Sequence, residues 1–325
     1  MSQLSKLYPI KFIPILKEKI WGGSKLKQLF NKNGEGKIGE SWEVSTVNDD
    51  VSIVENGSLK GNNLNQLIEA YQHRLVGKKV FKTFGKKFPL LFKFIDAKED
   101  LSVQLHPNDD LAKKRHNSFG KTEMWYILDA EEKGNLVLGF NKEMNESIYK
   151  KHLSENTLSE ILHSEKVKKG DSFIIESGIV HAIGAGVVLA EIQQTSDITY
   201  RIFDYNRPGI NGELRELHTD LAIDAIEYNN PSTRLNYLDK ENFPVQLSKN
   251  VFFQTNKIVL TQEMNRDLSA IDSFVVYMCV EGTGTFEMNG FLEKIVKGET
   301  LLVPAETNDL IIKSNSAILL EVYIP

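Results

Sequence analysis

The sequence contains one cysteine, Cys279, among its 325 residues. A single cysteine cannot form a disulfide within the chain, which is typical of proteins from a reducing compartment, so we expect a cytoplasmic protein. Cys279 lies in the apolar run FVVYMCV, which favours a place in the hydrophobic core over a role as a nucleophile.

Long hydrophobic runs and an excess of positive charge are also missing. No stretch approaches the roughly 20 apolar residues of a membrane-spanning helix, and the N-terminus has no uninterrupted apolar segment with a small-residue cleavage site. We therefore expect neither a membrane anchor nor a secretion signal. The formal charge of −5 argues against a general nucleic-acid-binding surface, although it leaves room for a local basic pocket that binds a small anion.

Short β-type segments dominate the chain. They are rich in Val, Ile, Phe and Tyr and are separated by Gly, Asn or Asp, which is typical of an all-β sandwich or barrel. The expected strands are 39–47, 88–97, 101–106, 123–128, 171–176, 187–194, 274–280, 299–304 and 317–324. Helical spacing is found only in 64–75, in 214–225 and in the mostly polar stretch 142–163, where Asn156 or Thr157 with Glu160 is the candidate N-terminal cap.

A weak internal repeat indicates that one β unit occurs twice. GDSFIIES at 170–177 resembles GETLLVPA at 298–305, and the strand that begins at Glu123 is matched by one that begins at Phe274. The polar segment 228–246 is a plausible connection between the copies. We thus predict a mainly β fold with two barrels, residues 1–235 and 236–325, and a few surface helices.

The two copies differ in chemistry. Aligning them pairs Glu123 with Phe274 and His181 with Asp309, so potential metal ligands occur only in the first copy. Any site is therefore expected in the first barrel, and the second is expected to be mainly structural.

Four residues of the first copy have the chemistry of a metal site. In LSVQLHPND, Gln104 and His106 alternate with apolar residues and so share one strand face with Ser102. Glu123 begins the next strong strand, and His181 precedes the glycine-containing AIGAG. Two imidazoles and a carboxylate are typical of a catalytic zinc site, with an amide oxygen as a fourth ligand. Manganese, iron, cobalt or nickel would also fit, and the alternative is a solvated strand face.

A second polar stripe lies in EIQQTSDITYRIFDYNR, residues 191–207. Glu191, Asp197 and Arg201 occupy alternate positions, although TSD is a point where the strand could be interrupted. Two acids with one arginine suit proton transfer on an anionic substrate, whereas the alternative is again a solvated face. Lys93, the only cation in FPLLFKFIDA, either reaches the surface or points into a polar pocket.

Together the motifs SVQLHPND, GKTEMWYIL, GIVHAIGAG and EIQQTSDITYRIFDYNR resemble those of type I mannose-6-phosphate isomerases of the shorter bacterial kind. The resemblance runs from KIWGG and GESWEVS near the N-terminus into the second barrel. It implies cupin-type jelly-roll barrels, one Zn²⁺ per chain, and interconversion of mannose 6-phosphate and fructose 6-phosphate through an enediol. The implied partner is a hexose 6-phosphate, with no nucleic acid and no membrane. The oligomeric state stays open, a monomer included.

The resemblance also assigns residues. The family's zinc ligands correspond to Gln104, His106, Glu123 and His181, and its catalytic arginine corresponds to Arg201. The candidates for the general base are Lys121, Glu191 and Asp197. The candidates for substrate binding are Ser102, Lys121, Arg207 and Lys93, the first three at positions that hold the substrate phosphate in the family. The chain lacks the large helical insertion of longer members, and Ile183 stands where some carry tyrosine.

Two other readings compete with an isomerase. One is a different cupin metalloenzyme, such as an iron oxygenase, although those sites usually have histidine-rich ligand sets. The other is a non-catalytic cupin that binds a sugar phosphate. Arg201 and the two acids beside the four ligands favour an enzyme.

Overall fold

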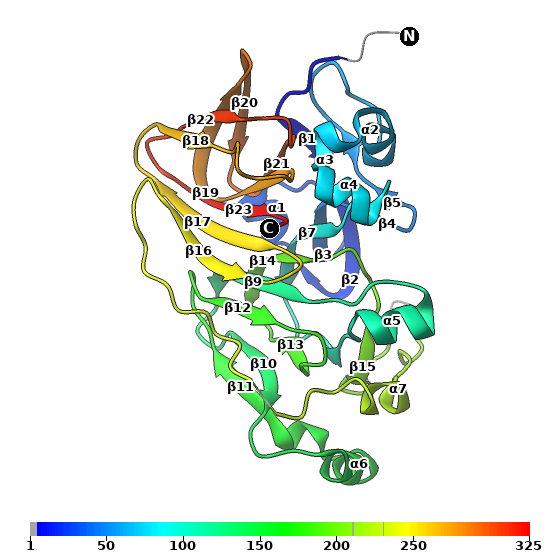
Figure 1. The fold of residues 1–325 in the computed structure, drawn as a ribbon. Helices are drawn as coiled ribbons and strands as arrows, with labels where there is room; N and C mark the ends of the chain where they lie inside the picture. The colour runs from blue at the N-terminus through cyan, green and yellow to red at the C-terminus, as the bar shows by residue number, and fades with distance from the viewer. Residues whose placement is uncertain (1–4, 210, 230) are drawn as a thin grey trace.

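Antiparallel strands make up most of the protein. The computed structural model describes residues 5–325 apart from positions 210 and 230, so the start of the expected first domain and one residue of the expected connection lie outside it. The strands form sheets of ten, six, five and two, which confirms the mainly β prediction (Figure 1). Among the residues described, no helix is long and apolar enough to cross a membrane.

Two of the sheets face each other and enclose the candidate site. The six-stranded sheet has the order β12 (Ser172–Ile175), β9 (Glu123–Ala130), β14 (Val187–Gln194), β7 (Leu90–Ala97), β2 (Ile15–Gly23) and β3 (Ile38–Val44). The five-stranded sheet has the order β11 (Leu162–Lys166), β10 (Asn135–Phe140), β13 (His181–Ile183), β8 (Val103–Leu105) and β15 (Tyr200–Phe203). Apolar side chains of both sheets, such as Leu189 and Leu136, pack into one buried cluster.

The ten-stranded sheet covers the other face of the six-stranded sheet. Its main path is β16 (Pro244–Lys249), β17 (Gln254–Leu260), β23 (Ala317–Tyr323), β19 (Val275–Met288), β21 (Thr300–Val303), β1 (Ile10–Ile13) and β6 (Ile53–Val54). Beside that path lie β18 (Met264–Asp267), β20 (Phe291–Val296) and β22 (Asp309–Lys313), and β4 (Thr46–Val47) pairs separately with β5 (Asp50–Val51). Because β1 pairs with β21, the chain's first strand belongs to the C-terminal sheet. The domain boundary at 235 stays a prediction, as does the closure of the sheets into cupin barrels.

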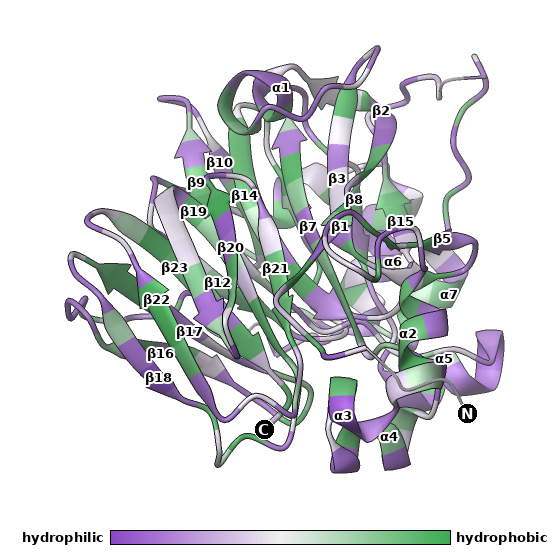
Figure 2. Ribbon diagram, turned by 90° about the horizontal axis from the view of Figure 1, so that it is seen from above, coloured by the Kyte–Doolittle hydropathy of each residue, from purple (hydrophilic) through white to green (hydrophobic). Residues whose placement is uncertain are grey.

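The largest core lies between the six- and ten-stranded sheets. Phe92 and Ile192 of the former pack with Val276 and Leu320 of the latter, all fully buried. Strand β14 is buried along its whole length because it has a sheet on either side, and Figure 2 shows apolar residues gathered along it.

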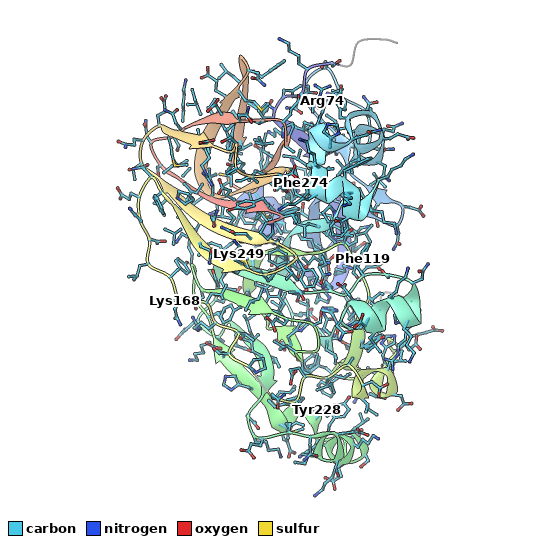
Figure 3. The ribbon with its side chains drawn as sticks, viewed as in Figure 1. Arg74, Phe119, Lys168, Tyr228, Lys249 and Phe274 are labelled. Carbon is cyan, nitrogen blue, oxygen red and sulfur yellow. The ribbon has the colours of Figure 1, made fainter. Side chains whose placement is uncertain are left out.

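Helices lie around the sheets. They are α1 (Lys25–Phe30), α2 (Leu64–Tyr71), α3 (His73–Val76), α4 (Lys78–Phe84), α5 (Asp109–His116), α6 (Glu146–Ser154), a 3₁₀ turn (Leu158–Ile161) and α7 (Thr219–Ile223). Helix α3 is joined to the ten-stranded sheet: Arg74 pairs with Glu306, and the amide of Phe274 donates to the carbonyl of Val76 (Figure 3).

The helix predictions are confirmed only in part. The stretch 64–75 forms α2 and α3, with Asn63 as the cap of α2. The predicted cap at 156–160 is wrong: Asn145 caps α6, and Thr157 precedes the 3₁₀ turn without a side-chain cap bond. In 214–225 only α7 is helical, because Leu214 forms a bridge with Pro208 and leaves its side chain exposed.

The order of strands supports the internal duplication. The run β7-β14-β9-β12 in the first copy matches β17-β23-β19-β21 in the second. In the first, Glu191 lies opposite Trp125 and accepts a hydrogen bond from its indole nitrogen. In the second, Glu321 lies opposite Tyr277 and accepts one from its hydroxyl. Both copies therefore bury an acid at the same place in the sheet.

In the second copy an arginine forms an ion pair with this acid. Arg266 donates to both oxygens of Glu321, at 2.8 and 2.9 Å, and the Glu321 side chain is fully buried. We expect Arg266→Ala to lower the free energy of unfolding by about 3 kcal/mol, since it leaves a buried charge unpaired. Urea denaturation measures this. The control, Lys313→Ala, removes an exposed pair with Glu287, and because water screens such a pair the free energy of unfolding should change much less than in Arg266→Ala. Equal losses would contradict the expectation.

Candidate active site

Three buried side chains from different strands meet between the two facing sheets. His106 follows β8, Glu123 begins β9 and His181 begins β13. The pairing of His181 with Gln104 sets the strands of the two histidines side by side in the five-stranded sheet. Glu123 reaches them from the facing six-stranded sheet, where it pairs with Gln193. One ligand atom from each of the three lies within 4.8 Å of the other two, and all three are buried. The structure thus brings together the predicted histidines and glutamate.

Both imidazoles are oriented by the backbone. Nδ1 of His106 lies 2.7 Å from the carbonyl oxygen of Ile198, and Nδ1 of His181 lies 2.8 Å from that of Ile179. Each Nδ1 therefore carries the proton and donates, which leaves the Nε2 lone pair facing Glu123, at 3.6 Å from His106 and 3.3 Å from His181. A backbone carbonyl that holds the far nitrogen of a histidine is the usual arrangement around a bound metal.

The protonation states suit metal binding. Burial lowers the pKa of His181 to about 4, and burial together with the charge of Lys121 lowers that of His106 well below its usual value. Both rings are then neutral near pH 7, the form that ligates metals. Oε1 of Glu123 and Nε2 of His181 are buried without a hydrogen-bond partner in the described part of the chain. Unpartnered buried atoms that converge in this way fit a cation.

Lys121 lies against the same atoms. Its ammonium is 2.7 Å from Oε2 of Glu123 and 3.1 Å from Nε2 of His106. Burial raises the pKa of Glu123 to about 7, even though the charge of Lys121 acts in the opposite direction. The imidazole and carboxylate atoms thus already surround a positive charge, which supports their assignment as a cation-binding group.

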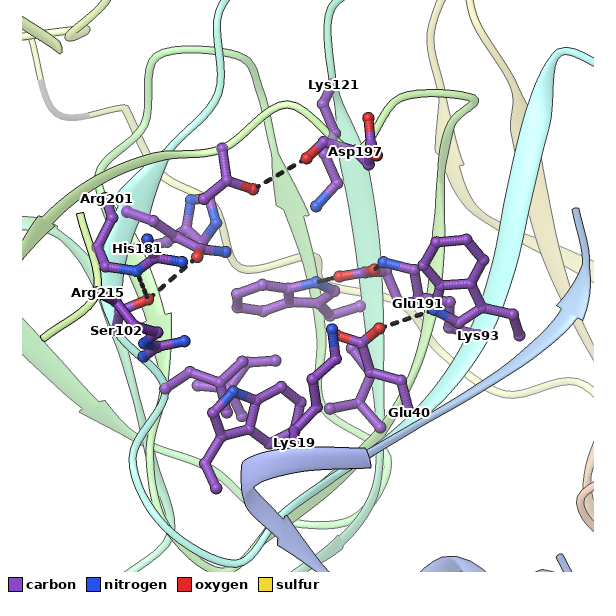
Figure 4. A pocket seen from close by; sticks show the side chains of 18 residues that line it. Lys19, Glu40, Lys93, Ser102, Lys121, His181, Glu191, Asp197, Arg201 and Arg215 are labelled. Carbon is purple, nitrogen blue, oxygen red and sulfur yellow. Dashed lines mark hydrogen bonds and ion pairs between the residues drawn. The ribbon is translucent and has the colours of Figure 1, made fainter. Parts of the chain in front are cut away.

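The cavity beside this group holds about 160 Å³. Most of the predicted site residues line it, namely Lys93, Ser102, Gln104, Lys121, His181, Glu191, Asp197 and Arg201 (Figure 4). Gln104 lies next to Ser102, whose hydroxyl is 3.5 Å from its Oε1. Its role as a fourth metal ligand stays a prediction, as do the roles of the other residues.

On one side of the cavity, Lys93 and Glu191 form a buried ion pair. Lys93 does not reach the surface: its ammonium is 2.8 Å from Oε1 of Glu191 and 2.7 Å from Oε1 of Gln193. Oε2 of Glu191 accepts a bond from the Trp125 indole at 2.9 Å. Burial alone would raise the pKa of Glu191, but the charges of Lys93 and Lys121 and these bonds lower it to about 2. Glu191 is therefore ionised at neutral pH.

Several residues that line this side of the cavity were not predicted from the sequence. Glu40 accepts a bond from the Trp42 indole at 2.7 Å, and its Oε1 lies 3.5 Å from the ammonium of Lys19. Trp21 and Trp125 also face the cavity. The alternation in GESWEVS places Glu40 and Trp42 on one strand face and was the available signal. No comparable pattern in the sequence pointed to Lys19 or Trp21.

The opposite side of the cavity is rich in arginine. Arg201 donates from Nε to the hydroxyl of Ser102 at 3.2 Å and from Nη1 to the carbonyl of Glu216 at 3.0 Å. Within the described residues it has no ion-pair partner. Arg215, which the sequence analysis did not single out, lines the cavity here, whereas Arg207 does not.

The polar stripe of residues 191–207 is broken, at the point where an interruption was considered. Strand β14 ends at Gln194 and β15 begins at Tyr200. Asp197 therefore lies in a loop at the mouth of the cavity, where its carboxylate is exposed and accepts a bond from the Asn48 amide. The break lets Arg201 approach the cavity from the five-stranded sheet, while Glu191 approaches it from the six-stranded sheet.

Comparison with known proteins agrees with this geometry. The family described as phosphomannose isomerase type I, catalytic domain, matches residues 10–152. The mannose-6-phosphate isomerase ManA of Bacillus subtilis (strain 168) is 35% identical over 300 residues, which cover 91% of this chain and 93% of the relative. The mannose-6-phosphate isomerase of Streptococcus mutans is 35% identical over 66% of each chain.

A solved structure is also similar over nearly the whole chain. The crystal structure of the mannose 6-phosphate isomerase from Bacillus subtilis aligns with a TM-score of 0.88 and 30% identity, covering 97% of this chain and 99% of that one. Similarity of sequence and of fold at this extent places the protein in the type I phosphomannose isomerase family.

Proposed function

We propose that the protein is a metal-dependent isomerase that interconverts mannose 6-phosphate and fructose 6-phosphate. The observation that carries the proposal is the buried group of His106, Glu123 and His181, which opens on a cavity with cations and acids. The family and the relatives named as mannose-6-phosphate isomerases support the same reaction. In this reaction a proton moves between C2 and C1 of the open-chain sugar through an enediol.

We further propose Zn²⁺ as the metal, held by Gln104 with the buried group. Two neutral imidazoles and one carboxylate, with room for substrate, match the ligand set of catalytic zinc. When bound, the ion acts as a Lewis acid on the sugar carbonyl and the neighbouring hydroxyl. The chain's contribution is orientation, since the carbonyls of Ile198 and Ile179 hold the rings in place.

Arg201 is assigned to the negative charge that develops on the enediol oxygens. Its guanidinium lines the cavity and is fixed by Ser102 and by the carbonyl of Glu216. A fixed, permanently charged donor costs little reorganisation when charge develops on the substrate.

Of the three candidates for the residue that takes part in the proton transfer, Lys121 lies closest to the metal group. It lies within 3.1 Å of His106 Nε2, next to where the reacting carbons would be held. Glu191 is bound at both oxygens and has a pKa of about 2, which makes it a weak proton acceptor at neutral pH. Asp197 is exposed at the cavity mouth. We assign Glu191 to positioning Lys93 and the sugar hydroxyls.

The reaction is tested by removing the metal. Purified protein is expected to convert mannose 6-phosphate to fructose 6-phosphate, to lose at least about 99% of that activity after dialysis against a chelator, and to regain it with Zn²⁺. A coupled assay for fructose 6-phosphate measures this. Folded, zinc-loaded protein without turnover would contradict the proposal and favour a non-catalytic cupin that binds sugar phosphates. Turnover that a chelator leaves intact would refute the metal dependence.

The cytoplasm is the proposed location, supported by the single, fully buried Cys279, which packs in the core of the ten-stranded sheet as expected. Two cupin-type barrels, divided near residue 235, are the proposed architecture, supported by the repeated order of four strands.

A further inference from the structure

The arginine-rich side of the cavity carries more positive than negative charge. Three guanidiniums, those of Arg201, Arg207 and Arg215, lie around one buried carboxylate, that of Asp204. The other acid nearby, Glu216, has a side chain that is 84% exposed, so water screens its charge. Of these three arginines only Arg201 and Arg215 line the cavity, so this side presents positive charge to an anionic group of the substrate.

Asp204 fixes the guanidinium of Arg215, and the N–H donors that Asp204 does not bind are available to the cavity. Its Nε and Nη2 donate to the two oxygens of Asp204, at 2.7 and 2.5 Å. In the described part of the chain no hydrogen bond is made by Nη1. A guanidinium fixed on one edge presents its remaining N–H groups in a known direction, which suits a phosphate oxygen. Arg215 and Arg201 line the same cavity, on the side where Ser102 lies (Figure 4).

Arg207 is turned away from this cavity. An unbroken strand would place positions 201 and 207 on one face, but Tyr205 and Asn206 have φ angles of 57° and 53°, in the left-handed region. The chain therefore turns after β15. Arg207 donates to Asp204 at 3.1 Å and packs over the Tyr205 ring, and its Nη2 is buried without a partner in the described residues.

From this geometry we propose that Arg215 binds the substrate phosphate, next to Ser102 and Arg201, and that Arg207 only positions Asp204. The assignment deepens the proposed function and rests on it for the identity of the substrate.

Steady-state kinetics with mannose 6-phosphate test the proposal. We expect Arg215→Ala to raise KM about tenfold or more, with kcat within about threefold of the wild type, because a contact made equally in ground and transition states is lost. The matched control, Arg74→Ala, removes an arginine that pairs with Glu306 and does not line the cavity, so it is expected to change KM less than about threefold. Arg207→Ala is the rival variant, and it should raise KM less than Arg215→Ala does. Arg215→Lys, which keeps the charge and loses the planar fork, should fall in between and covers the case that the alanine variant does not fold.

A binding measurement separates this proposal from the proposed function. Calorimetric titration of zinc-loaded protein with inorganic phosphate should show binding that Arg215→Ala weakens about tenfold and the control Arg74→Ala leaves unchanged. If the protein binds phosphate through Arg215 but shows no turnover, the assignment of the anion site holds and the proposed isomerase activity is refuted. An unchanged KM and unchanged phosphate binding in Arg215→Ala, or a larger effect in Arg207→Ala, would overturn the assignment of Arg215.

Discussion

Replacing His106 by alanine is expected to remove the metal and, with it, the activity. The side chain is fully enclosed, and its Nε2 is one of the three ligand atoms that converge between the sheets. Changes to groups that merely orient metal ligands already cost 10- to 100-fold in affinity or activity, so the loss of a ligand is expected to lower turnover at least about 100-fold. Metal content after dialysis, measured by atomic emission, should fall below about a tenth of the wild-type value.

The control for this variant is His163→Ala, since His163 lies on β11 with its side chain exposed and outside the metal group. It should keep both metal and activity. Glu123→Gln has nearly the volume of the native residue and keeps an amide oxygen but loses the negative charge. It is expected to weaken metal binding less than His106→Ala does, without loss of packing. Full metal occupancy in folded His106→Ala would show that the ligand assignment is wrong.

Replacing Arg201 by alanine is expected to abolish most of the turnover while the metal stays bound. Arg201 contacts Ser102 and a backbone carbonyl and is not part of the buried ligand group. Removing one preorganised donor from a developing oxyanion typically costs about 100- to 1,000-fold in kcat, and a similar loss is expected here. Metal analysis and kcat measured on the same preparation give the two values together.

A second variant, Arg201→Lys, tests whether the planar guanidinium is needed in addition to the positive charge. It keeps the charge and loses the planar arrangement of donors, so it should recover only part of the lost kcat. A metal content that falls along with activity in Arg201→Ala would indicate a structural role instead. Wild-type turnover in that variant would remove Arg201 from the mechanism.

The candidate ligands could be predicted from the sequence because they lie in or next to short strands, where alternate residues share one face. Gln104 and His106 share a face through the two-residue period of β8, and Glu123 starts β9 as expected. The buried setting of Lys93 was one of two readings that the sequence left open. Only the structure decided between them, since the partners that hold its ammonium, Glu191 and Gln193, come from a strand almost 100 residues away.

Residues whose position depends on a turn were not predictable in the same way. Alternation from Arg201 would carry Arg207 along the same strand face, but two left-handed residues redirect the chain. Arg215 enters the cavity from a segment without a strand or helix, held there by Asp204. The helix expected over 214–225 forms only in part. A bridge between Leu214 and Pro208 competes with helical hydrogen bonds at its start.

The sequence by itself predicted the mainly β class, the repeated unit and the two histidines and one glutamate that meet between the sheets. These depend on residue type and on period, which are local properties of the chain. Tertiary structure alone decided which cations meet in the cavity, that Lys93 is paired with Glu191, and that the second copy buries Glu321 against Arg266. Such pairings depend on strand register and loop direction, which are fixed by contacts between residues far apart in the chain.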